Sequence, residues 1–165
     1  MSILVPVYST GVTMNEVPDH LAFYIEFGNC KQKCKGCHSP HLWESVEKKT
    51  DINDLVAAAS DAVSKGANAI VLMGGTTNGF STAHLISLID KLAEVAPVCL
   101  YSGSDDYELN LLIAMNTRLT WVKTGSYQEA KGGLMSTETN QKFLRKENVN
   151  LGCVVFIDET YKFKI

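Results

Sequence analysis

The sequence of 165 residues lacks three features that define large classes of proteins. Its 15 Lys and Arg residues do not exceed its 18 Asp and Glu residues, and the net charge of −3 does not suit binding to the phosphates of a nucleic acid. The longest apolar runs, such as residues 67–73, are far shorter than the roughly 20 residues that cross a bilayer. Residues 1–10 contain no basic region followed by a long apolar stretch. We therefore expect no nucleic-acid partner, no membrane segment and no secretory signal.

Cysteine is too scarce, and too unevenly placed, for a disulfide framework. The five cysteines form an odd set, and Cys30, Cys34 and Cys37 lie within eight residues. Such crowding is typical of a metal site in a reducing compartment, which predicts a cytoplasmic metalloprotein. Cys99 and Cys153 lie in apolar runs, and we expect both to be small core residues.

The length predicts a single domain that spans residues 1–165 and is too short for a closed eight-unit βα barrel of about 250 residues. Short apolar runs alternate with amphipathic ones. Strands are predicted at residues 21–27, 69–73, 98–101 and 119–123, and helices at 51–65, 81–94 and 105–114. Two further strands are predicted at residues 151–157 and 161–165. The alternation indicates parallel strands and right-handed crossovers, so we expect an α/β fold, an open partial (βα) barrel of four to five units.

The residues with the most distinctive chemistry follow the predicted parallel strands. Residues 30–37 follow the first strand, Gly74 and Gly75 the second, residues 102–103 the third and residues 124–125 the fourth. Loops at the carboxyl ends of parallel strands form one edge of the sheet, where α/β folds bind their ligands. We therefore expect these four loops to meet.

The cysteine segment has the spacing C-x3-C-x2-C, formed by Cys30, Cys34 and Cys37. Three thiolates on one loop suit a [4Fe–4S] cluster in which one iron has no cysteine ligand and is open to a small molecule. Two alternatives remain at this point. His41 follows Cys37 by four residues and would complete a closed Cys3His zinc site in a non-catalytic module, or the thiols are buried and inert.

This spacing directly after a strand resembles the signature of the radical S-adenosylmethionine (SAM) superfamily. From about residue 21 to residue 143 the chain resembles the activating enzymes of anaerobic ribonucleoside-triphosphate reductases, and five segments carry this resemblance. They are CKGCHSPHLW (34–43), LMGGTTN (72–78), LYSGSDDYEL (100–109), KTGSYQEAKGGL (123–134) and STETNQKF (136–143). The resemblance implies a barrel of the radical SAM type.

The resemblance also implies an activity. Cys30, Cys34 and Cys37 are expected to ligate a catalytic [4Fe–4S] cluster that reductively cleaves SAM to methionine and a 5′-deoxyadenosyl radical. That radical is expected to generate a glycyl radical on the anaerobic (class III) reductase, with flavodoxin or ferredoxin as the electron donor. An activase of another glycyl-radical enzyme, or a small radical SAM enzyme acting on a metabolite, remains an alternative.

The residues that the resemblance assigns to SAM lie in two loops. They are Gly36, Cys37, His38, Gly74 and Gly75. Residues 101–103 and 124–127 are expected to line the SAM cavity or the entry for the glycine.

Two positions depart from the pattern of the family. Lys35 stands where many members carry an aromatic residue, which removes a stacking partner for adenine. Thr76 stands where relatives carry an acidic residue that meets the SAM ammonium group, so Thr77 or Asn78 would have to replace that contact with neutral hydrogen bonds.

Overall fold

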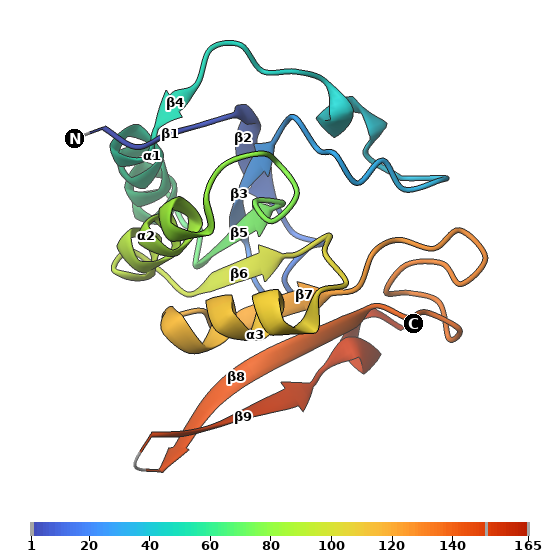
Figure 1. Ribbon diagram of the computed structural model, residues 1–165. Coiled ribbons are helices and arrows are strands. Elements are labelled where there is room, and N and C mark those ends of the chain that lie inside the picture. The colour runs from blue at the N-terminus through green and yellow to red at the C-terminus, as the bar shows by residue number, and fades with distance from the viewer. Residues whose placement is uncertain (1, 151, 165) are drawn as a thin grey trace.

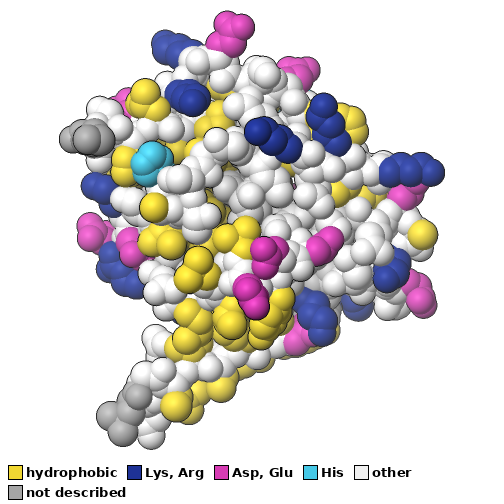
Figure 2. Space-filling model, in the orientation of Figure 1, with side chains coloured by type: hydrophobic (Ala, Val, Ile, Leu, Met, Phe, Trp, Pro, Cys, Tyr) yellow, Lys and Arg dark blue, Asp and Glu magenta, His cyan; other side chains and the backbone are white. Residues whose placement is uncertain are grey.

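The computed structural model describes residues 2–150 and 152–164, and it contains a seven-stranded mixed sheet (Figure 1). The strand order is β2-β3-β5-β6-β7-β8-β9. The four central strands are parallel: β3 (Ala22–Phe27), β5 (Ala69–Met73), β6 (Val98–Tyr101) and β7 (Trp121–Thr124). The outer strands are antiparallel to their neighbours: β2 (Val7–Thr13), β8 (Lys142–Asn150) and β9 (Cys153–Asp158). Strands β8 and β9 form a hairpin that projects from the rest of the molecule (Figure 2).

Three α-helices connect the parallel strands, and each begins at a side chain that caps it. The helices are α1 (Ile52–Ser64), α2 (Thr82–Ala93) and α3 (Tyr107–Asn116). Asp51, Ser81 and Asp106 accept hydrogen bonds from main-chain N–H groups of the first turns, which would otherwise lack partners. The remaining elements are short: β1 (Leu4–Val5) pairs with β4 (Thr50–Asp51), and η1 (Pro40–Trp43) and η2 (Thr160–Phe163) are single 3-10 turns.

The predicted open partial (βα) barrel of four to five units, of the radical SAM type, is wrong. The described chain contains three strand–helix units, β3–α1, β5–α2 and β6–α3, within a mixed open sheet. After β7 the chain enters a turn-rich segment, residues 125–140, in which Gly, Ser, Thr and Asn favour turns over a helix. The chain then returns antiparallel as the β8–β9 hairpin, so the parallel series ends at four strands.

Strand β2, at the edge of the sheet, was not among the predicted elements. Its seven residues alternate between half-buried and exposed positions, because only one face lies against the protein. The predicted strand at 161–165 is wrong as well, because Thr160–Phe163 forms the 3-10 turn η2; Ile165 and Leu151, the first residue of the predicted strand 151–157, lie outside the described residues. The other predicted strands and helices are present within a few residues of the expected bounds.

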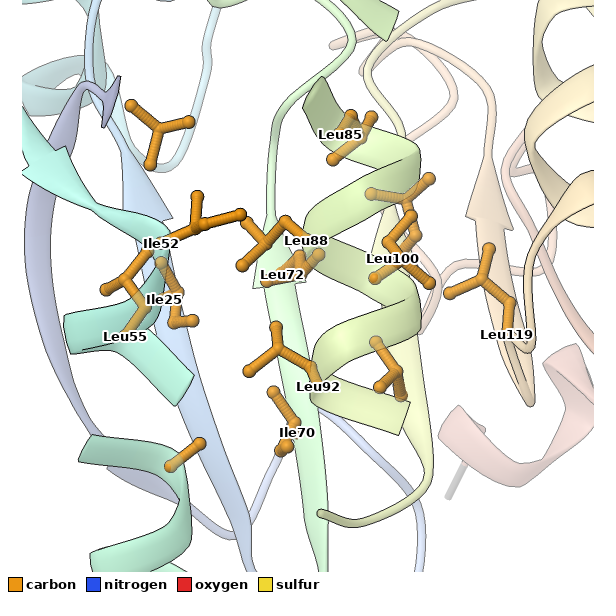
Figure 3. Close-up of a cluster of buried hydrophobic side chains, with 14 of the residues drawn as sticks. Ile25, Ile52, Leu55, Ile70, Leu72, Leu85, Leu88, Leu92, Leu100 and Leu119 are labelled. Carbon is orange, nitrogen blue, oxygen red and sulfur yellow. The ribbon is translucent and has the colours of Figure 1, made fainter. Parts of the chain in front are cut away.

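The helices all pack against one face of the sheet, where they form the larger core (Figure 3). Alternate strand residues such as Ile25, Ile70 and Leu72 meet leucines of α2 in this core. The opposite face carries a smaller core without α-helical residues, to which Val71, buried Cys99, Trp121 and Phe143 contribute. The expectation for Cys153 is wrong: it is exposed, because it lies where the projecting hairpin turns.

No helix among the described residues combines the length and the apolar character needed to cross a bilayer.

We expect the substitution Leu88→Ala to destabilise the fold by about 2–5 kcal/mol, because it opens a cavity in the larger core where Leu88 is fully buried. Leu112→Ala, at a half-exposed position of α3, is the matched control and is expected to change stability by less than about 1 kcal/mol. Urea unfolding of the two variants measures the difference, and equal losses would contradict this description of the core.

Candidate functional site

The cysteine loop leaves β3 and folds back on itself before η1. Cys30, Cys34 and Cys37 are half-buried free thiols on this loop. The N–H of Cys37 donates to the carbonyl of Cys34 at 3.1 Å, and Gly36 between them has a φ of 73°, a conformation that suits glycine. The base of the loop is closed by the N–H of Cys30, which donates to the carbonyl of Leu42 at 2.8 Å. The loop thus presents three thiols from one short, closed turn.

The loop after β5 lies directly beside the cysteine loop. Thr77 Oγ1 is 3.3 Å from Cys30 Sγ, and the Thr77 carbonyl accepts a hydrogen bond from the N–H of Lys31 at 2.9 Å. Gly74 and Gly75 have φ values of 109° and 115°, and a Cβ on Gly75 would lie 2.8 Å from the Leu85 side chain. Both positions therefore require glycine for the turn itself, whatever ligand they meet.

Asn78 joins the two loops. Its side-chain amide donates to the carbonyls of Phe27 and Gly28 at 3.2 and 2.6 Å, and its Oδ1 accepts from the N–H of Gly75 at 2.6 Å. Asn78 is only 2% exposed. The hydrogen-bonding groups of Asn78 are therefore used within the protein. Thr77, which lies beside Cys30, is the better placed of the two residues expected to take over the ligand contact of the acidic residue that Thr76 replaces.

The segment after β7 also contacts the cysteine loop. The rings of His38 and Tyr127 meet edge to face with centroids 4.9 Å apart. Lys35 Nζ is 3.6 Å from Glu129 Oε2, and a Cβ on Gly36 would lie 3.0 Å from the Glu129 side chain. We call residues 125–140 the strap.

The remaining contacts complete a ring of four loops, as expected for loops at the carboxyl ends of parallel strands. Thr76 Oγ1 of the β5 loop is 3.1 Å from Ser102 Oγ of the β6 loop. Asp105 of the β6 loop accepts from both the N–H and the hydroxyl of Ser126 in the strap, at 2.7 and 2.5 Å. Each loop is thus fixed to its neighbours, and all the predicted site residues lie on this ring.

A row of side chains crosses the sheet beside the ring, and of these only Tyr101 was expected from the sequence to line the site. Glu26, Met73, Tyr101 and Lys123 are register partners on β3, β5, β6 and β7 and lie on the face without helices. These residues lie in strands that are otherwise apolar and were therefore expected to be core. The polar residue near the carboxyl end of each outer parallel strand could have indicated the row.

Lys123 is the cation of this row. Its Nζ lies 4.8 Å from the centroid of the Tyr101 ring. Burial lowers the pKa of Lys123, and the charges of Glu16 and of the thiols of Cys99, Cys37 and Cys34 act in the opposite direction. Burial also raises the pKa of Tyr101 far above its usual range, so its hydroxyl stays protonated and donates to the main-chain carbonyl of Glu16.

The donor set distinguishes two kinds of metal centre. His41, the fourth ligand of the alternative zinc site, has its Nε2 2.9 Å from Glu26 Oε2 and its ring against Tyr8. Among the described residues, no three His, Cys, Asp or Glu side chains are placed so that they could hold one metal ion. The thiolates of an iron–sulfur cluster bind different irons and stand farther apart than the ligands of a single ion. The three half-buried thiols on one loop are of the ligand type that iron–sulfur clusters use.

Comparison with known proteins identified no relative: no family model, no curated protein and no solved structure matches the chain.

We expect Asn78→Ala to lower the free energy of unfolding by about 2 kcal/mol or more, because it leaves the buried N–H of Gly75 and two carbonyls without their partner. Asn53→Ala removes an exposed amide from α1 and is the control. If chemical denaturation shows equal stability for both variants, Asn78 does not join the loops as described.

Proposed function

We propose that this protein activates an anaerobic ribonucleoside-triphosphate reductase by generating a glycyl radical on it. In this proposal Cys30, Cys34 and Cys37 hold a [4Fe–4S] cluster, and SAM is the source of the radical. The observation that carries the proposal is the placement of three half-buried free thiols, with C-x3-C-x2-C spacing, at the carboxyl edge of four parallel strands. The proposal does not need a barrel, because open α/β sheets also bind ligands at this edge.

The chemistry that such a cluster supplies when bound is the one-electron cleavage of SAM. One group of the chain is placed to interact with a cluster ligand directly: the N–H of Ser39 donates to Cys37 Sγ at 3.3 Å. Hydrogen bonds to the sulfurs are among the features that tune an iron–sulfur cluster.

Other residues of the ring shape the space for a ligand. Gly74 and Gly75 form the tight turn of the β5 loop beside the cysteine loop, where a Cβ would meet Asn78 and Leu85. Thr77 presents its hydroxyl beside Cys30. Tyr127 and Glu129 of the strap contact His38 and Lys35 of the cysteine loop.

The proposal includes a setting and two partners. Iron–sulfur chemistry and five free cysteines suit the reducing cytoplasm. The partners are the glycyl-radical subunit of the reductase and an electron donor such as flavodoxin or ferredoxin.

Anaerobically purified protein is expected to contain about four irons and four sulfides per chain and to show a broad visible absorption that dithionite bleaches. Any one of the substitutions Cys30→Ala, Cys34→Ala and Cys37→Ala should abolish SAM cleavage, because each removes a thiolate ligand. Iron and sulfide analysis, the visible spectrum and the yield of 5′-deoxyadenosine measure these effects.

Cys153→Ala, at an exposed position of the hairpin, is the matched control and should retain iron and cleavage activity. A colourless protein with one bound zinc would refute the proposal, and loss of the cluster in Cys153→Ala would show that the assigned ligand set is wrong.

A further inference from the structure

Helix α3 is apolar on two sides. Towards the protein it buries Ile113 and Ala114, yet Leu111, Leu112 and Met115 remain 36%, 50% and 48% exposed. A helix that is hydrophobic all round is typical of a helix buried on all sides. Helices α1 and α2 are amphipathic by contrast, since each buries one stripe of residues. The outer face of α3 therefore has the composition of a covered surface.

A groove of about 450 Å³ runs between α3 and the β8–β9 hairpin. Leu111 and Ala114 form one apolar wall, and Leu144 and Phe156 form the other. At its polar end the groove reaches Asp105 and Gly125, which belong to the β6 loop and the strap. Asp105 holds Ser126 of the strap, so the groove ends at the β6 loop and the strap, two of the four loops of the ring.

The charge around the polar end is negative. Asp105, Asp106 and Glu108 lie at the amino-terminal end of α3, and residues 105–117 contain no Lys or Arg. Lys142 also lines the groove, but its Nζ is 3.9 Å from Asp158 Oδ2. Figure 2 shows acidic side chains beside the hydrophobic ones that gather over α3 and along the hairpin. An occupant with matching chemistry is apolar along the groove and basic at the end near the ring.

We propose that this groove binds an extended segment of the reductase polypeptide, with an aliphatic or aromatic side chain between α3 and the hairpin and a basic residue beside the amino-terminal end of α3. This inference rests on the proposed function and names the surface by which the partner docks. The apolar surface continues outside the groove over Leu112 and Met115, and such a broad patch suits a polypeptide better than a small molecule.

The substitution Leu111→Asp tests the groove, with Leu4→Asp as the matched control at an exposed leucine of β1. Calorimetric titration of each variant with the purified reductase subunit, without oxygen, measures the dissociation constant. Leu111→Asp is expected to weaken binding by about tenfold or more, as a charge in an apolar contact does, and Leu4→Asp should bind like the unmodified protein. Glu108→Lys should also weaken binding, and added salt should reduce the difference between it and the unmodified protein.

Both leucine variants should retain the iron content and the rate of SAM cleavage measured without reductase, which separates docking from the chemistry of the site. Unchanged affinity of Leu111→Asp for the reductase would overturn the docking proposal. A change in its oligomeric state at unchanged reductase affinity would overturn it too, because a second copy of the chain would then cover α3.

If the unmodified protein cleaves SAM but does not bind the reductase, the docking proposal fails while the cluster assignment stands. If the unmodified protein holds no iron–sulfur cluster, the proposed function itself fails. Should Leu111→Asp not fold, Leu111→Ala replaces it, with an expected loss of affinity of several-fold from the missing apolar contact.

Discussion

The parallel pairing of β3, β5, β6 and β7 is the constraint on which the rest of the structure depends. Because these strands run the same way, their carboxyl ends lie at one edge, and the four loops that follow them are forced together. Hydrogen bonds and side-chain contacts then join each loop to the next, from Cys30 and Thr77 round to Tyr127 and His38. The cysteine loop is contacted by the β5 loop and the strap as well as by its own turns, and the β6 loop joins those two.

The two faces of the sheet have different roles. One face carries all three helices and most of the buried apolar side chains, which supply the stability of the fold. The other face has a smaller core and carries the row of Glu26, Met73, Tyr101 and Lys123 next to the ring of loops. Polar and titratable groups are therefore concentrated where no helix covers the sheet, and burial there lowers the pKa of Lys123, which lies over the Tyr101 ring.

Local signals in the sequence predicted most elements of this fold. Helical periodicity and short apolar runs located the helices and the parallel strands, because these features depend on neighbouring residues alone. The architecture depended on what those runs pair with. Nothing local in residues 7–13 indicated that they cover the edge of β3, and the antiparallel return after β7 was not visible in the strap. The sequence pattern therefore suggested a barrel where an open mixed sheet forms.

The sequence also predicted only part of the candidate site. The cysteines and the paired glycines can be recognised in the sequence by their spacing. Lys123 and Glu26 lie within apolar strands, and only the register of the strands shows that they belong to one row beside the site. Asn78 shows the converse: expected as a ligand contact, it is occupied in joining two loops.

The central claim is that three thiolates hold a cluster whose chemistry ends on another protein. Its most direct test is electron paramagnetic resonance of the anaerobic reductase after incubation with this protein, SAM and a reductant. The account predicts a doublet signal from a glycyl radical on the reductase, which requires SAM and is lost with Cys34→Ala. No such signal from a preparation whose iron–sulfur cluster is intact would contradict it.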